Sequence, residues 1–356
     1  MPSRCNCSSN SSLPYARSTH QGNFVMIRSP RMRSRGDPRV RESAPIALSR
    51  ERYPVMTPHS TSVGIALALL TFFPVMTVRA QAARDYLNTP VNAAAMFIDL
   101  IGSNSETAAD SDLPLPNTEA VGYHGAATFL WSFPLRDRYA GVGVTGTYAD
   151  VKVTGPAGEI STSGFADPSI TFHANIFGGP ALRSDQFAQA IPQTFSSFHL
   201  TVNAPLGSYD RSSPVNAGAN RWAFYPLVNL SITPDKGVSW IDLYAGARFF
   251  TNNNAFRGNG QLSQNPLVTL SAFYSHNIGE RMYAGIGVSY DHGGETYNNH
   301  IPQHDTADGF RPGVSLSRRR TIWKYALTLR YELTGTTPRA GPRNSLVSIR
   351  VSGPLF

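Results

Sequence analysis

Three stretches of the sequence hold residue types that could do chemistry. The first, GVGVTG at residues 141–146, has the glycine spacing of a dinucleotide-binding loop. Such a loop needs a helix after it, because the helix N-terminus binds the pyrophosphate. Here the stretch follows a turn and continues as alternating sequence. We therefore interpret these glycines as small residues within a strand, and we expect no cofactor.

The second stretch, HIPQHDTAD, offers His300, His304, Asp305 and Asp308, whose side chains are of metal-ligand type. Ligand types alone do not fix a coordination geometry, and the polar surroundings predict a surface loop. We expect no metal site there.

The third group consists of His124, His173 and His199, each in an alternating segment. Each imidazole could serve as the base of a hydrolase. However, no G-x-S-x-G elbow occurs, and both cysteines (Cys5 and Cys7) lie near the N-terminus. Polar residues lining the interior of a membrane barrel explain these histidines more simply, so we expect no catalytic residues.

The elements that would position these residues are strands. In TIWKYALTLRYEL (residues 321–333), large apolar residues alternate with polar and charged ones. In a helix the two sets would mix around the axis, whereas in a strand each set occupies one face. A soluble β-sandwich shows the same alternation, so this segment alone does not choose the architecture.

The rest of the chain favours a membrane barrel. We predict about twelve strands, near residues 91–101, 120–133, 138–148, 167–178, 195–204, 221–232, 238–250, 267–277, 282–291, 311–317, 321–333 and 345–355. Short turns, including 318–320, alternate with long polar loops, including 149–166, as in outer-membrane barrels. One connection, 179–194, is longer than a turn, and we predict a short helix there with Ser184 as its N-cap.

The face opposite the apolar residues would then line the barrel interior. Charged members of this set would create a local field for permeants, and the ring residues could stack against aromatic solutes. The predicted lining residues are His124, His173, His199, Asp242, Tyr244, Arg248, Phe250, Lys324, Thr328, Arg330, Glu332 and Arg350.

The net charge of +8 does not indicate a nucleic-acid partner. Residues 1–82 hold eleven arginines and three acidic residues, which already gives +8. The remaining residues therefore carry equal numbers of basic and acidic side chains. A basic surface that would bind nucleic acid is not expected in this part of the chain.

The N-terminal region reads as an export signal. Residues 63–78 carry no charge and are followed by RAQA, so we predict a signal peptide over residues 56–82, with Ala80 and Ala82 at the cleavage site. A transmembrane helix is the weaker interpretation because the run is short and contains Pro74. Residues 1–55 would be a disordered leader or lie upstream of the true start, and residues 83–356 would form the barrel.

Several motifs together resemble a known family. ARDYLNTP (83–90), FADPSITF (165–172), APLGSYD (204–210), NAGANRWAFYP (216–226), YAGARFFTNNNAF (244–256), QNPL (264–267) and SYDHGGET (289–296) are similar to the outer-membrane transporter family associated with the meta-pathway of phenol degradation. The resemblance implies an outer-membrane β-barrel of a Gram-negative bacterium that admits small, aromatic or hydrophobic compounds. At Ala255 and Arg257 the chain departs from the acidic and aromatic residues frequent in the family.

We therefore expect an all-β, transmembrane antiparallel up-and-down barrel of about 12 strands (10 to 14) that takes up small hydrophobic or aromatic compounds passively. Its expected partners are outer-membrane lipid, these solutes and the barrel-assembly machinery. Two alternatives stay open from the sequence: a barrel enzyme acting on lipid or peptide, and a plugged structural or adhesive barrel.

Overall fold

The computed structural model describes residues 81–107, 118–156, 158–322, 325–334 and 342–355. The chain divides into two units, Met1–Val55 and Met56–Phe356. All described residues belong to the second unit, so the leader and most of the predicted signal peptide lie outside them.

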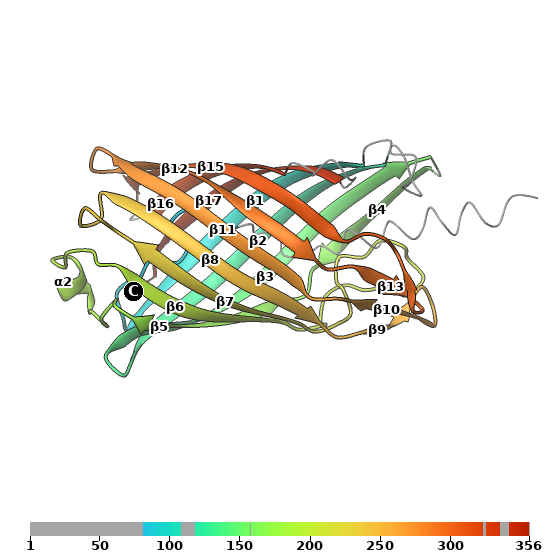
Figure 1. The fold of residues 1–356 in the computed structure, drawn as a ribbon, viewed down its shortest axis with the longest axis horizontal. Coiled ribbons are helices and arrows are strands. Elements are labelled where there is room, and N and C mark those ends of the chain that lie inside the picture. The colour runs from blue at the N-terminus through green and yellow to red at the C-terminus, as the bar shows by residue number, and fades with distance from the viewer. Residues whose placement is uncertain (1–80, 108–117, 157, 323–324, 335–341, 356) are drawn as a thin grey trace, which may run out of the picture. The chain divides into compact units, whose positions relative to one another are not determined.

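Twelve antiparallel strands form a closed ring within this part of the chain (Figure 1). The wall strands are β1 (Ala93–Thr107), β2 (Glu119–Leu135), β3 (Arg138–Gly155), β5 (Ser169–Phe177), β6 (Phe195–Asn203), β7 (Ala223–Ile232), β8 (Ser239–Phe250), β11 (Leu267–Ile278), β12 (Met282–Gly293), β15 (Ala307–Ile322), β16 (Tyr325–Thr334) and β17 (Pro342–Pro354). The first strand pairs with the last in the register Ile98↔Val351. This closure confirms the predicted barrel and rejects the sandwich.

The outer face of the wall is apolar. On β8, Ile241 and Leu243 are exposed, whereas Asp242 between them is completely buried on the inner side. The same alternation exposes Leu270 on β11 and Ile349 on β17. A closed barrel satisfies every strand edge internally, which hydrocarbon requires. Among the described residues, no helix is both long and apolar enough to cross a bilayer.

The two ends of the barrel differ. Tight turns and the short helix α2 (Ser184–Phe187) occupy one end, on the left in Figure 1. Longer connections occupy the other end, where β9 (Asn253–Phe256), β10 (Gly260–Gln264), β13 (Thr296–Asn298) and β14 (Ile301–Pro302) form a small separate sheet. This arrangement matches the predicted alternation of short and long connections.

Three local predictions were wrong. The predicted loop 149–166 is mostly a hairpin in which β3 continues to Gly155 and pairs with β4 (Gly158–Phe165). The predicted turn at 318–320 belongs to β15, where Arg318 pairs with Leu327. The helix at 179–194 does occur, but Arg183 is its N-cap and Ser184 is its first residue. In the hairpin, β4 holds one large aliphatic residue, Ile160, which packs against Val151 and Val153 of β3, so its sequence shows little apolar alternation.

Candidate functional site

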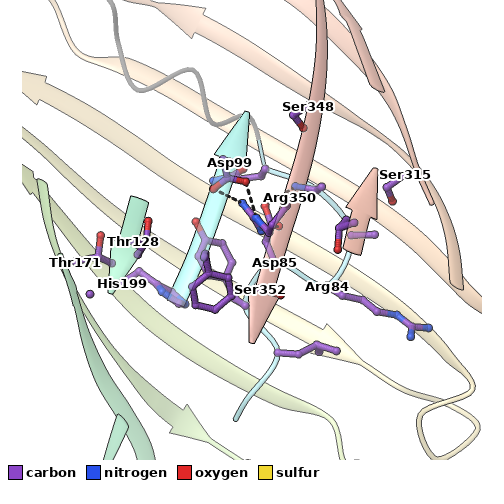
Figure 2. A pocket seen from close by; sticks show the side chains of 18 of the residues that line it. Arg84, Asp85, Asp99, Thr128, Thr171, His199, Ser315, Ser348, Arg350 and Ser352 are labelled. Atoms are coloured by element: carbon purple, nitrogen blue, oxygen red, sulfur yellow. Dashed lines mark hydrogen bonds and ion pairs between the residues drawn. The ribbon is translucent and has the colours of Figure 1, made fainter. Parts of the chain in front are cut away.

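A cavity of about 1640 Å³ occupies the barrel interior. Its lining includes Glu280 and Arg281 near the end with tight turns, and Asp308 and Asn344 near the end with long connections. Threonine, serine and histidine side chains from the wall strands line the space between them (Figure 2), together with tyrosines. Lining of this kind suits a solute-sized space rather than a packed core.

The N-terminal segment, residues 81–92, lies inside the barrel and lines part of this cavity. Arg84 fixes one side of it: its backbone N–H donates to Asp242 Oδ2 at 2.9 Å, and its guanidinium donates to Ser275 and Asn277. The same guanidinium lies 4.3 Å from the centre of the Tyr283 ring. Three strands of the wall therefore hold this single residue.

Asp85 fixes the opposite side through Arg350. Arg350 of β17 donates to Asp99 at 2.7 Å and to Asp85 at 3.2 Å (Figure 2). Asp99 and Arg350 face each other because they are direct partners in the β1–β17 pairing. All three side chains are largely buried. Charged groups are retained in such surroundings when they are paired and hydrogen-bonded.

The end of the segment that leads into β1 is also bonded to the wall. Thr89 shares a hydrogen bond with Tyr139 of β3, and Ser132 of β2 donates to the carbonyl of Pro90. Asn88 accepts a hydrogen bond from Asn175 of β5. The segment is thus anchored at several points around the barrel, and the cavity lies beside it.

Aromatic and imidazole rings form a continuous series across the interior. Tyr139 stacks on His173 with ring centres 5.2 Å apart, and His173 lies 5.5 Å from His199, its direct partner across β5 and β6. The ring centre of Tyr86, in the N-terminal segment, lies 4.1 Å from that of His199. The Tyr244 ring follows, with its centre 5.3 Å from that of Tyr86. Apart from the closer Tyr86–His199 pair, these separations are typical of favourable ring contacts.

A buried hydrogen-bond chain connects His199 to Asp242 across three strands. His199 Nε2 bonds to Ser197 Oγ, and Ser197 bonds in turn to Asn229. Asn229 Nδ2 donates to Ser231 Oγ, which donates to Asp242 Oδ1 at 2.6 Å. Direct pairing between Ser197 and Asn229, and between Ser231 and Asp242, produces this chain.

The predicted lining residues have several positions in the structure. Six of them line the cavity: His124, His173, His199, Arg248, Thr328 and Arg350. Asp242 and Tyr244 are buried instead, because Arg84 and Ala82 of the N-terminal segment bond to them. The ring of Phe250 is not part of the cavity lining. The guanidinium carbon of Arg221 lies 4.5 Å from the centre of this ring.

Three more predicted residues lie on or beside β16. Lys324 is outside the described residues, and for Arg330 and Glu332 only the backbone is described. That backbone pairs Arg330 with Ser348 and Glu332 with Leu346.

A family model described as "Putative MetA-pathway of phenol degradation" matches residues 117–350, which is more than half of the chain. The chain belongs to this family. The match begins after the N-terminal segment, so the contacts of that segment are observations on this chain alone.

Solved structures agree with the fold. An outer membrane channel from Pseudomonas putida F1 matches with a TM-score of 0.67 and 18% sequence identity, over 78% of this chain and 100% of that chain. A FadL homologue from Pseudomonas aeruginosa matches at 0.41 and 10% identity, over 73% of this chain and 89% of that chain. The TM-score of 0.41 is too low to support the assignment of the fold. No curated protein matches the sequence.

Motifs that carry the family resemblance meet at the long-loop end of the barrel. Asp167 of FADPSITF accepts hydrogen bonds from the backbone N–H groups of Gly207 and Ala219, both at 2.9 Å. A Cβ atom on Gly207 would approach Asp167 Oδ1 to 2.7 Å, so this glycine permits the contact. Burial raises the pKa of Asp167, and the two N–H donors oppose this rise. One carboxylate therefore holds both arms of the loop 204–222.

The two other chemical motifs have structural roles. Residues 141–146 lie within β3, as expected, with no helix after them. Asp305 accepts hydrogen bonds from Thr296, and Asp308 accepts one from Tyr290. Within the described ranges, no group of three or more His, Cys, Asp or Glu residues is placed to hold a metal ion.

Proposed function

We propose that the protein is a channel for passive uptake of small hydrophobic or aromatic compounds across the outer membrane of a Gram-negative bacterium. The observation that carries this proposal is the 1640 Å³ cavity, lined by polar and ring side chains within a closed barrel that is apolar outside. Membership of the family supports it. Outer-membrane lipid would surround the wall, and the barrel-assembly machinery would insert it.

The interior favours uncharged or dipolar solutes. Arg350 is paired with Asp85 and Asp99, and Arg311 is paired with Asp291 at 2.6 Å. Charges of both signs therefore lie close together and cancel at a distance, so an ion would gain little from them. The interior rings offer apolar faces to a planar solute.

The cavity also bears on the alternative of a plugged barrel. The N-terminal segment fills part of the interior, yet residues at both ends of the barrel line the cavity beside it. A structural barrel would need no such space.

The enzyme alternative draws on one contact, between Ser197 Oγ and His199 Nε2 at 2.7 Å. A nucleophilic serine must give its proton to the histidine. Here Ser197 donates to Asn229 instead, so the histidine is the donor in the pair. Hydrolysis of lipid or peptide esters that is lost in Ser197→Ala would nevertheless establish an enzyme and set our proposal aside.

The direct test is solute flux into proteoliposomes, with phenols, fatty acids and sugars compared against empty vesicles. Ser348→Trp should reduce flux because Ser348 lines the cavity. Val347→Trp is the matched control, because Val347 is the neighbour of Ser348 in β17 and its exposed side chain faces outward. Absence of flux for every solute, or equal flux in both variants, would contradict passive uptake through this cavity.

A further inference from the structure

Tyr86 places a phenol ring from the chain's own N-terminal segment in a cage of wall residues. The ring centre lies 4.1 Å from that of His199 and 5.3 Å, edge-on, from that of Tyr244. Tyr86 also packs against the buried cluster that contains Leu227 and Phe273. We call the four wall residues, His199, Leu227, Tyr244 and Phe273, the ring cage. Its size and apolar walls suit one six-membered aromatic ring.

One wall of the ring cage carries an unused hydrogen-bond acceptor. The Asp242 carboxylate accepts from Ser231, so Ser231 must accept from the Asn229 amide. The carbonyl of that amide then accepts from Ser197, whose oxygen accepts the proton on His199 Nε2. This order leaves His199 Nδ1 unprotonated.

Buried His199 Nδ1 has no hydrogen-bond partner among the described residues. A buried polar atom without a partner costs free energy that a suitable ligand group recovers. Since Nδ1 carries a lone pair and no proton, the matching ligand group is an O–H or N–H donor. A solute in the cavity meets this part of the wall, because both Tyr86 and His199 line it.

We propose that the ring cage is a binding subsite for a hydroxylated aromatic permeant, whose ring takes the place of Tyr86 and whose hydroxyl group donates to His199 Nδ1. The inference rests on the proposed uptake function and adds a basis for selectivity. Asp242 acts as a positioning residue, because it sets the proton order through Ser231, Asn229 and Ser197. A hydrocarbon of the same shape fills the ring cage but leaves Nδ1 without a donor.

The test removes the Tyr86 ring from the ring cage and compares the binding of phenol and toluene. In the full-length Tyr86→Ala protein in detergent, phenol should bind about tenfold or more tightly than toluene, which is of similar shape but lacks the donor. Binding is measured by calorimetry and by the shift in thermal unfolding. Tyr86→Phe is the control: its ring still fills the cage, so phenol should bind much more weakly to it than to Tyr86→Ala.

A second variant isolates the acceptor. Tyr86→Ala combined with His199→Phe keeps a ring in the cage wall but removes Nδ1, so phenol should lose its advantage over toluene. Equal binding to Tyr86→Ala itself, or an unchanged preference for phenol in the double variant, would overturn the proposal.

A flux measurement covers the case in which Tyr86→Ala does not fold. The phenol-to-toluene flux ratio should then fall in His199→Phe relative to the unmodified protein, and an unchanged ratio would overturn the subsite. The two proposals fail separately. Phenol binding without flux contradicts the channel alone, whereas flux without a phenol preference contradicts the subsite alone.

Discussion

At the scale of single residues, Arg350 joins parts of the chain that lie far apart in sequence. Its guanidinium binds Asp99 on the first strand and Asp85 on the N-terminal segment. A guanidinium suits this role because its planar array of donors can serve two carboxylates at once. The last strand is thereby bonded both to the first strand and to the contents of the barrel.

Replacing Arg350 with methionine should destabilise the barrel strongly. The change leaves two buried carboxylates without their cation, and loss of one partner of a buried pair typically costs about 3–5 kcal/mol. The free energy of unfolding in lipid vesicles measures the effect. The control is Lys152→Met in the exposed pair with Glu159, which should cost less than about 1 kcal/mol. Equal losses would show that the Arg350 contacts add no stability.

Asp167→Ala should loosen the loop 204–222. The substitution removes the acceptor for two backbone N–H groups, and each unsatisfied donor costs about 1–3 kcal/mol if it stays buried. Limited proteolysis should therefore cut this loop faster, while the barrel stays intact. Asp235→Ala, in a turn at the opposite end, is the control. Unchanged cleavage of the loop in Asp167→Ala would contradict its role.

At the scale of elements, β16 shows how one strand serves two environments. Leu329 is exposed on the outer face, whereas Thr328 lines the cavity and bonds to Ser317 of β15. Adjacent residues therefore meet lipid and an aqueous interior. The sequence alternation in this region predicts the same two faces.

Leu329→Arg should destabilise the barrel more than Thr328→Arg does. Arginine on the lipid face near the bilayer centre costs about 2–4 kcal/mol. In the interior the same side chain stands opposite Arg350 in the β16–β17 pairing, where the carboxylates of Asp85 and Asp99 and the polar cavity offset the added positive charge. Refolding free energy into lipid vesicles measures both variants, and conductance should change only in Thr328→Arg. A larger loss for Thr328→Arg would reverse the assignment of the faces.

The strands were predictable because alternation of apolar and polar residues is a local property. β4 was not predicted because GEISTSGF contains few large apolar residues. The interior position of the N-terminal segment was not predicted because its residues follow no period. The link from His199 to Asp242 depends on the registers of three strands, which local patterns do not specify. The histidines could therefore be predicted as interior residues, but not as parts of a hydrogen-bond chain.

At the scale of the whole molecule, a closed barrel should resist detergent. Every wall strand has two paired neighbours, so unfolding requires many hydrogen bonds to break together. In a detergent gel, unboiled protein should therefore migrate differently from boiled protein. Identical migration, together with solubility in the absence of detergent, would speak against a membrane barrel.

The N-terminus of protein purified from outer membranes should be Gln81 or Ala83. Export through the predicted signal peptide removes the apolar run 63–78. A start at Gln81 would keep its hydrogen bonds to Tyr225 and Ser271. N-terminal sequencing distinguishes the two starts, and an intact 63–78 run would contradict the predicted export signal.

The N-terminal segment also affects how the barrel is assembled. It continues directly into β1, whose pairing with β17 closes the ring. Arg350 on β17 binds Asp99 of β1 across this seam, and it also binds Asp85 of the N-terminal segment. Closure of the ring and placement of the segment thus depend on the same guanidinium, and we expect the two events to be coupled.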